Sequence, residues 1–172
     1  MTVVFRGKLF AVEQEPISLA NGKTITAEWV SRTDGARVIA LREDDSILIN
    51  DEYRHELGAR DLHLPGGKIE GGRTALEAAA AELREETGYT AADWTPLGSS
   101  HPFATVRYSL HYFLARELTY DPIEYDEGED IKVSWVSFDE AVRMAIDGRV
   151  GEDLSALQIL RLAWKRGTLL QG

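Results

Sequence analysis

The stretch LPGGKIEGGRTALEAAAAELREETGY, residues 64–89, joins a glycine-rich turn to an acidic helix. Thr74, followed three residues later by Glu77, predicts a capping box at the start of the helix. Gly88 predicts its C-terminal end, because glycine readily adopts the left-handed conformation that closes a helix. At about 100° per residue, one stripe of side chains should face the core. Its predicted members are Leu76, Ala80, Leu83 and Thr87.

Three glutamates, Glu82, Glu85 and Glu86, lie near the end of this helix. Glu82 and Glu86 are one turn apart, and like charges at that spacing repel by roughly 0.2–0.5 kcal/mol on an isolated helix. The helix dipole also disfavours anions there. Mg²⁺ would remove the repulsion, because it binds carboxylate oxygens and keeps water and phosphate oxygens as further ligands. The alternative interpretation is a solvated acidic face.

The composition indicates an ordinary globular protein. With 172 residues, one domain is the default, and the 44% hydrophobic and 28% charged residues suit a packed core. A net charge of −10 argues against a nucleic-acid partner. The chain has no cysteine, no signal peptide in MTVVFRGKLF and no apolar run long enough to span a membrane. We therefore expect a cytoplasmic protein without a membrane partner.

Strand patterns surround the helix on both sides. Residues 7–32 predict two strands joined at Asn21-Gly22, a favoured hairpin turn. Residues 36–54 predict a second pair around Asp44-Asp45. Ser137 and Glu140 predict another capping box, opening a helix that reaches about Gly148. Further predicted elements are short strands within 61–67, 94–100, 106–118 and 131–138 and a last helix over 154–166.

The glycine-rich turn and its helix resemble the Nudix box. The positions that match are Gly67, Glu82, Leu83, Glu85, Glu86, Gly88 and Tyr89. Two positions depart from the box, since Arg73 stands where a glutamate is expected and Ala81 where an arginine is expected. The segments INDEYRHELGARDLHLPGG and DEGEDIKVSWVSFDEAVRMAIDGRV are similar to those of ADP-ribose pyrophosphatases and related nucleoside-diphosphate-sugar hydrolases. The resemblance covers roughly residues 25–165.

This resemblance implies an α+β Nudix fold, a mixed β-sheet between helices preceded by an antiparallel hairpin. The expected organisation is one domain, with N-terminal strands over 1–34 and the Nudix core over 35–172. The implied activity is Mg²⁺-dependent hydrolysis of a small molecule, a nucleoside diphosphate linked to another group, with Mn²⁺ as a substitute metal. A homodimer that exchanges its N-terminal strands is also implied.

The resemblance assigns roles to individual residues. The implied metal ligands are the Gly66 carbonyl, Glu82, Glu85, Glu86 and Glu129. Glu127 is the implied general base, with Glu82 as the competing one. The candidate substrate-binding residues are Arg54, Trp29 and Lys68. Alternatives remain open, because Trp29 could fill the core, Arg54 could pair with Glu52 or Glu56, and the acidic loop around Glu127 could be a solvated turn.

The two departures from the box predict a working but slow hydrolase. Losing both members of a supporting pair is milder than losing one, because no buried partner is left unsatisfied. Weaker support around metal ligands still costs about 10- to 100-fold in affinity or activity. Arg73 could instead pair with Glu70 or Glu77. The remaining alternatives are a hydrolase of nucleoside triphosphates or capped RNA, a non-catalytic nucleotide-binding module, and an interaction domain.

Overall fold

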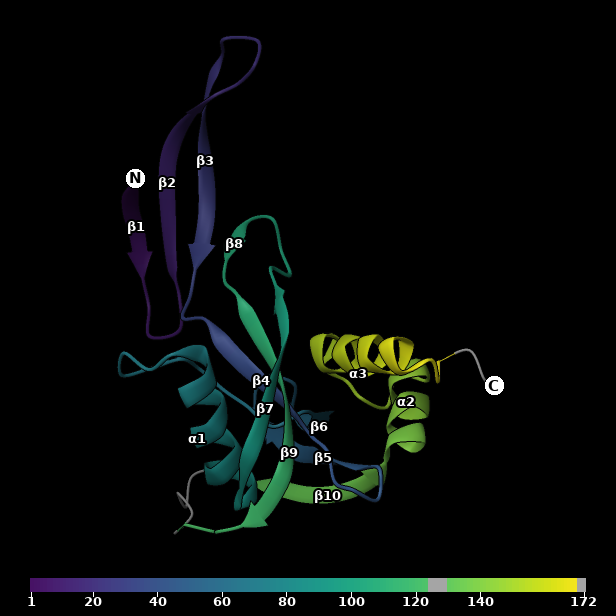
Figure 1. The fold of residues 1–172 in the computed structure, drawn as a ribbon. Helices are drawn as coiled ribbons and strands as arrows, with labels where there is room; N and C mark the ends of the chain where they lie inside the picture. The colour runs from purple at the N-terminus through teal and green to yellow at the C-terminus, as the bar shows by residue number, and fades with distance from the viewer. Residues whose placement is uncertain (124–129, 170–172) are drawn as a thin grey trace.

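The structure is a computed structural model that describes residues 1–123 and 130–169. Within these residues the chain forms strands arranged in three sheets and three helices (Figure 1). The strands are β1 (Thr2–Arg6), β2 (Ala11–Ser18), β3 (Thr24–Ser31), β4 (Gly35–Ala40), β5 (Ser46–Arg54), β6 (Ala59–His63), β7 (Tyr89–Ser100), β8 (Val106–Arg107), β9 (Leu110–Tyr120) and β10 (Ile131–Ser137). The helices are α1 (Ala75–Thr87), α2 (Phe138–Ile146) and α3 (Asp153–Arg166).

Two of the sheets form the body of the molecule. In one, β4 pairs in parallel with β9, which pairs antiparallel with β7. In the other, β5 lies between β10 and β6, and both pairings are antiparallel. The prediction that β4 and β5 form a hairpin pair is therefore wrong. Leu41, which follows β4, forms one antiparallel bridge with Ile47 of β5, and the Arg42 amide donates to the Ser46 carbonyl across the turn. Beyond this turn at Asp44-Asp45 the two strands belong to different sheets.

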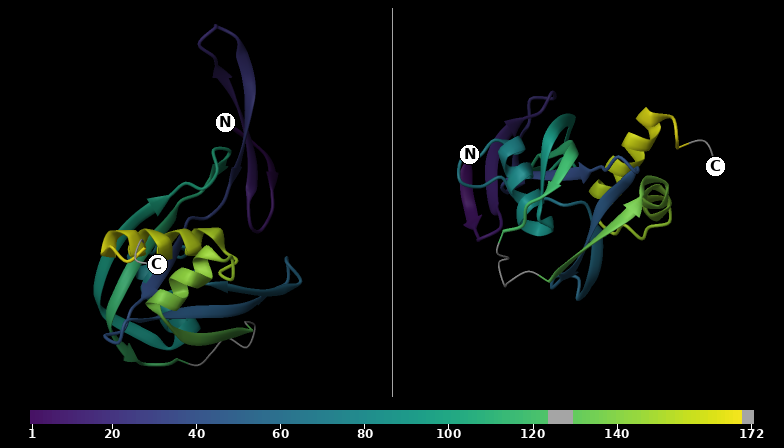
Figure 2. Two further views of the ribbon diagram at one scale, coloured as in Figure 1. Left: turned by 90° about the vertical axis from the view of Figure 1, so that its right-hand side faces the viewer. Right: turned by 60° about the horizontal axis from the view of Figure 1, so that its bottom comes forward.

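The sheets lie between α1 on one side and α2 with α3 on the other (Figures 1 and 2). Every residue of β4 is buried, and its apolar side chains are divided between two clusters. Val38 packs with Ala79 and Leu83 of α1, whereas Ile39 packs with the cluster that includes α2 and α3. This layered arrangement agrees with the predicted α+β fold. No helix among the described residues is long and apolar enough to cross a membrane.

Helix α1 has the predicted ends but a different buried face. Thr74 and Glu77 form the reciprocal capping box, and Gly88 closes the helix in the left-handed conformation. Leu76 is 41% exposed, so its predicted core position is wrong. Small alanines pack against β4 instead, and this rotates the buried face towards Glu86. The buried residues are Ala78, Ala79, Leu83, Glu86 and Thr87.

Helix α2 begins at the predicted cap but ends earlier than expected. The Ser137 hydroxyl accepts a hydrogen bond from the Glu140 amide, as a capping residue should. The Glu140 carboxylate accepts hydrogen bonds from Arg143 and Arg149. The helix ends at Ile146 rather than at Gly148. The last predicted helix is confirmed as α3, which begins one residue earlier than expected.

The N-terminal strands form a third sheet that extends away from the body (Figures 1 and 2). The hairpin at Asn21-Gly22 is confirmed, because β2 and β3 pair over their whole length up to Ser18 and Thr24. An additional strand, β1, pairs along the outer edge of β2 and has all its residues exposed. The two-residue β8 joins the inner edge in parallel with β3. Much of this sheet therefore has no layer packed on it.

Candidate active site

The turn after β6 is held against β4 by hydrogen bonds at alternate residues. The amide of Val38 donates to the Pro65 carbonyl, and the amide of Ala36 donates to the Gly67 carbonyl, both at 2.9 Å. Gly66 has a φ of +138°, and a Cβ there would collide with the Ala36 carbonyl oxygen. The sequence needs glycine at this position because the turn passes directly against the backbone of β4.

Helix α1 brings two glutamates to this turn. Glu86 is 7% exposed, and its Oε2 accepts hydrogen bonds from the Gly66 amide at 2.8 Å and from Asn50 Nδ2 at 2.9 Å. Glu82, one helical turn earlier, packs its carboxylate against Gly67 so closely that a Cβ on Gly67 would lie 2.5 Å from Oε1. Both carboxylates therefore reach the turn from the same face of the helix.

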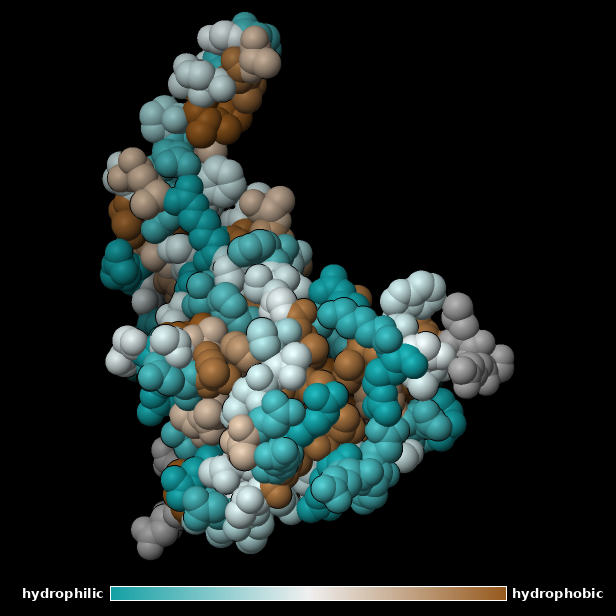
Figure 3. Space-filling model, in the orientation of Figure 1, coloured by the Kyte–Doolittle hydropathy of each residue, from teal (hydrophilic) through white to brown (hydrophobic). Residues whose placement is uncertain are grey.

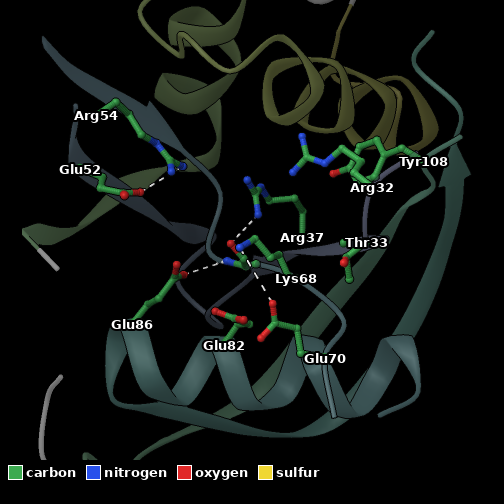
Figure 4. Close-up of a pocket in the computed structure, with 13 residues that line it drawn as sticks. Arg32, Thr33, Arg37, Glu52, Arg54, Lys68, Glu70, Glu82, Glu86 and Tyr108 are labelled. Carbon is green, nitrogen blue, oxygen red and sulfur yellow. Dashed lines mark hydrogen bonds and ion pairs between the residues drawn. The ribbon is translucent and has the colours of Figure 1, made fainter. Parts of the chain in front are cut away.

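These groups line a cavity of about 390 Å³ (Figure 4). Its wall mixes basic and acidic side chains from separate parts of the chain. The basic residues are Arg32, Arg37, Arg54 and Lys68, and the acidic ones are Glu52, Glu70, Glu82 and Glu86. A wall of this kind suits an anionic ligand accompanied by a cation, since each then meets groups of opposite charge.

Arg54 lies at the cavity but already has a carboxylate partner. Its Nη2 is 3.0 Å from Glu52 Oε2, as the alternative interpretation predicted. The same oxygen of Glu52 lies 2.9 Å from Nε2 of the buried His63. Burial lowers the pKa of His63, and the charges of Arg37 and Arg54 lower it further. Arg54 is thus held at the cavity wall by a fixed group of neighbours.

Arg32 and Lys68 are held more loosely. The Arg32 guanidinium lies 4.5 Å from the centre of the Tyr108 ring, and among the described residues it makes no ion pair with a carboxylate. The exposed Lys68 lies 3.9 Å from Glu70 Oε1. Both cations can therefore turn towards an incoming anion at little cost.

Comparison with known proteins places this geometry in a family. Residues 31–154 match the NUDIX domain. An ADP-ribose pyrophosphatase of Bacillus subtilis (strain 168) is 31% identical over 173 residues, which cover 98% of this chain and 92% of that protein. The chain belongs to the Nudix family.

Two further comparisons agree with this Nudix assignment. The methanol dehydrogenase activator of Bacillus methanolicus is 28% identical over 92% of this chain and 89% of its own length. A crystal structure of an ADP compounds hydrolase matches with a TM-score of 0.79 and 25% identity, covering 98% of this chain and 94% of that one. The predicted Nudix fold, the resemblance to the ADP-ribose pyrophosphatase branch and the prediction of a Nudix pyrophosphohydrolase are confirmed.

The Nudix cavity gathers about half of the predicted site residues. Gly66, Glu82 and Glu86 line it together with Arg54 and Lys68. Glu85 is exposed and does not line it. Glu127 and Glu129 lie outside the described residues.

Trp29 lies on β3 in the N-terminal sheet and does not line the cavity either. Its Nε1 is buried without a hydrogen-bond partner among the described residues. The Arg107 guanidinium lies 4.9 Å from the centre of its ring. Trp29 is therefore neither a plain core residue nor part of the wall of this cavity.

The two departures from the Nudix box, at Arg73 and Ala81, remove the glutamate and the arginine that the box would place there. Arg73 is exposed and forms no side-chain ion pair within the described parts of the chain. Its amide donates to the Glu70 carbonyl at 3.3 Å, whereas the Glu77 carboxylate is bound in the capping box. Ala81 has no polar group to offer. The proposed pairing of Arg73 with Glu70 or Glu77 thus forms no direct ion pair among the described residues, although the charge of Arg73 adds to the hydrogen bonds with Thr74 in lowering the pKa of Glu77.

The oxygen ligands of the cavity fit a hard divalent cation in their chemistry. The Gly66 carbonyl and the Glu82 and Glu86 carboxylates are the kind of ligand that Mg²⁺ prefers. Among the described residues, no group of three or more histidine, cysteine, aspartate or glutamate side chains could hold a metal ion by itself. The Gly66 carbonyl would add a third protein oxygen to the two carboxylates, and the predicted ligand Glu129 lies outside the described residues.

Arg37, which lines the cavity, and its partner Glu152, which does not, were not identified from the sequence. Arg37 stands within GARVIAL, which reads as an apolar strand, and Glu152 contacts it from 115 residues further along the chain. A single charge in a strand that is otherwise apolar was the available signal, because such a charge must find a partner. No local pattern could have identified that partner.

Proposed function

We propose that this Nudix protein hydrolyses ADP-ribose, or another nucleoside diphosphate joined to a sugar, with Mg²⁺ as cofactor and Mn²⁺ as a substitute. The proposal rests on one observation, a cavity whose wall carries the cations Arg32, Arg54 and Lys68 together with Glu82 and Glu86. The relatives named ADP-ribose pyrophosphatase and ADP compounds hydrolase support this choice of substrate.

The proposed reaction assigns phosphate binding and proton transfer to different residues of the chain. Arg32, Arg54 and Lys68 bind the diphosphate oxygens, since guanidinium and ammonium groups donate hydrogen bonds to phosphate. Bound Mg²⁺ would neutralise charge on the diphosphate and make the attacking water more acidic. Glu127 accepts the proton of that water, with Glu82 as the alternative base.

The reaction balances as a hydrolysis. The water oxygen forms a new bond to one phosphorus atom, and the bridging P–O bond of the anhydride breaks. One proton of the water goes to the carboxylate, and the leaving phosphate departs on the sugar. The products from ADP-ribose are two phosphomonoesters, a nucleoside monophosphate and a sugar phosphate.

A turnover screen with Mg²⁺ tests the proposal. Its substrates are ADP-ribose, nucleotide sugars, dinucleotides and nucleoside triphosphates, and release of a nucleoside monophosphate is measured. We expect Glu82→Gln and Glu127→Gln each to lower kcat by about 100-fold or more, as losses of metal-binding or proton-transfer groups do. Glu85→Gln should have a smaller effect because Glu85 is exposed and does not line the cavity. Glu43→Gln, on an exposed turn, is the control.

The alternatives predict different results from the same screen. Full activity in both Glu82→Gln and Glu127→Gln would contradict the mechanism. Binding without turnover would favour a non-catalytic regulatory module. The relative named methanol dehydrogenase activator is one reason to test this alternative. Faster turnover of nucleoside triphosphates than of ADP-ribose or nucleotide sugars would identify triphosphates as the substrate class instead. An interaction domain should show no thermal shift with Mg²⁺ plus nucleotide, because ligands that bind the native state stabilise it.

We further propose that the protein is a homodimer joined through the N-terminal sheet. This sheet carries large apolar side chains that nothing covers in a single protomer, and Figure 3 shows hydrophobic residues along the extension. They are Val3, Val4, Phe5, Leu9, Phe10, Leu19 and Ile25. A second copy would cover them and bring Trp29 to the partner's cavity as a substrate contact. Exposed apolar surface of this kind marks association sites.

A cytoplasmic location remains part of the proposal. It is supported by the absence of cysteine from the sequence and by the nucleotide substrate class. Cell fractionation with an antibody to the protein would test it, since recovery outside the cytoplasmic fraction would contradict it.

A further inference from the structure

Arg37 is a charged residue in the middle of a buried strand. All six residues of β4 are buried, and Arg37 is 9% exposed. Its neighbours two and four positions along, Ile39 and Leu41, belong to the cluster packed on α2 and α3. A guanidinium in such a place is stable only when its charge is paired and its N–H groups are bonded.

The partners of Arg37 come from two distant segments. Nε and Nη2 donate to the two carboxylate oxygens of Glu152 at 2.9 and 2.6 Å, a bidentate pair. Nη1 donates to the carbonyl oxygens of Gly66 and Ala36. Since arginine has five N–H donors, nearly all of its capacity is used. The guanidinium is therefore fixed in orientation, with one side on Glu152 and the other on the turn.

The charges of the pair are mutually stabilised. Burial alone would raise the pKa of Glu152, but the hydrogen bonds and charge of Arg37 overcome this and lower it to about 2. Burial alone would lower the pKa of Arg37, and Glu152 reverses that effect too. Both groups are thus charged throughout the physiological range.

A second link ties the start of the same turn to the same place. The Ser155 hydroxyl donates to Glu152 Oε2, and the Leu64 amide donates to Ser155 Oγ at 3.0 Å. Leu64 and Gly66 are therefore both anchored to the first turn of α3, one through Ser155 and the other through Arg37. Figure 4 shows Arg37 above the turn, opposite the glutamates of α1.

We propose that Arg37 and Glu152 are positioning residues that fix the Gly66 carbonyl as a metal ligand. The inference rests on the proposed function. A carbonyl oxygen has two lone pairs, so the hydrogen bond from Arg37 leaves one for a cation. Besides Glu86 of α1, which binds the Gly66 amide, support for the turn comes from β4 and α3. The two box positions on the α1 side add none, because Ala81 offers no donor and Arg73 lies in solvent. Partners of metal ligands typically contribute 10- to 100-fold to affinity or activity.

Arg37→Lys tests this inference while keeping the charge. Lysine lacks the planar fork, so it cannot hold both oxygens of Glu152 and the Gly66 carbonyl together. The measurement is the Mn²⁺ dissociation constant of the substrate-free protein by electron paramagnetic resonance at 20 °C, with the Mg²⁺ concentration for half-maximal turnover as second readout. We expect both values to rise by about 10- to 100-fold. Arg166→Lys is the matched control, because Arg166 pairs with Asp45 at 2.6 Å outside the cavity.

Ser155→Ala provides a second, uncharged variant in case Arg37→Lys does not fold. It removes the anchor of Leu64 and the hydroxyl on Glu152, and we expect weaker Mn²⁺ binding by roughly 10-fold. A purely structural role would lower Tm in these variants but leave the Mn²⁺ dissociation constant equal to that of Arg166→Lys, and this result would overturn the inference. If the unchanged protein neither binds Mn²⁺ nor turns over substrate, the proposed function fails and the inference fails with it.

Discussion

Gly67 shows how a single hydrogen atom in place of a side chain serves the site. Alanine there would place its Cβ 2.5 Å from Glu82 Oε1, and the flexible carboxylate would have to move. Gly67 does not have a positive φ, so alanine should not strain the backbone. We expect Gly67→Ala to fold with nearly unchanged Tm and to lose about 10- to 100-fold in kcat, because a metal ligand is displaced. Circular dichroism melting and steady-state kinetics measure the two effects.

The control for Gly67 is Gly71→Ala. Gly71 lies in the same glycine-rich segment but has open space around it and a φ of +66°. This substitution should therefore lower Tm slightly through backbone strain and leave kcat unchanged. Equal kinetic losses in both variants would argue against a specific clash with Glu82.

Glu152 predicts a pH dependence of stability. Its pKa is lowered from 4.5 to about 2 in the folded protein, so the unfolded chain takes up the proton first as the pH falls. The stabilisation is complete above about pH 4.5 and is lost as the pH approaches 2. The loss amounts to roughly 3 kcal/mol, since one pKa unit corresponds to about 1.4 kcal/mol.

Urea unfolding at pH 5 and pH 3 measures this effect in the native protein and in Glu152→Gln. The variant should be less stable at pH 5, because Arg37 is left buried without its charge partner. Its stability should also fall less between the two pH values than that of the native protein. An equal loss of unfolding free energy between pH 5 and pH 3 in the two proteins would show that Glu152 does not cause the pH dependence.

At the residue scale, the sequence allowed the acidic helix and the turn to be predicted because their spacing is local. Glu82 and Glu86 are one helical turn apart, and Gly66 precedes them by a short segment, so one pattern contains them all. Arg37 and Glu152 meet only through tertiary packing, which no spacing rule describes. Glu85 matches the pattern as well as Glu86 does, yet the rotation of α1 exposes it.

At the element scale, helix α1 depends on its N-cap residue, Thr74. The Thr74 hydroxyl accepts from the Glu77 amide, and the Glu77 carboxylate accepts from the Thr74 amide at 2.7 Å. We expect Thr74→Ala to lower the free energy of unfolding by about 1 kcal/mol, as lost N-caps usually do. Denaturant unfolding measures the change, and Thr74→Ser, which keeps the hydroxyl, should stay close to the native value. An unchanged midpoint for Thr74→Ala would contradict the role of the cap.

Strand positions were predictable from the sequence, whereas strand partners were not. The apolar runs of β4 and β5 stand where the sequence indicates, since the alternation and the flanking turn residues are local signals. Their pairing depends on β9 and β10, which lie far along the chain and offer longer ladders. The two aspartates between the runs therefore lie in a tight turn that leads from one sheet to the other, and the ladder between the two runs does not extend beyond Leu41 and Ile47. The strand β1 was missed because it alternates no apolar and polar residues.

At the scale of the whole molecule, the N-terminal sheet makes the oligomeric state testable. Phe5, which is 52% exposed on β1, lies among other apolar residues of the sheet. We expect Phe5→Asp to convert a dimer to a monomer in size-exclusion chromatography with light scattering, because a buried charge at the interface is costly. Ile146→Asp, an equally drastic change at an exposed site on α2, should leave the dimer intact. A native protein that is monomeric at every concentration would contradict the proposal.

The anchored turn from Leu64 to Gly67 has a consequence for the motions of the protein. Its amides donate to groups that are themselves buried, the Leu64 amide to Ser155 and the Gly66 amide to Glu86. In hydrogen–deuterium exchange, this irregular segment should then be protected as strongly as the central strands, opening only with the larger unfolding events. Backbone that belongs to no helix or sheet would thus count among the slowest-exchanging parts of the chain.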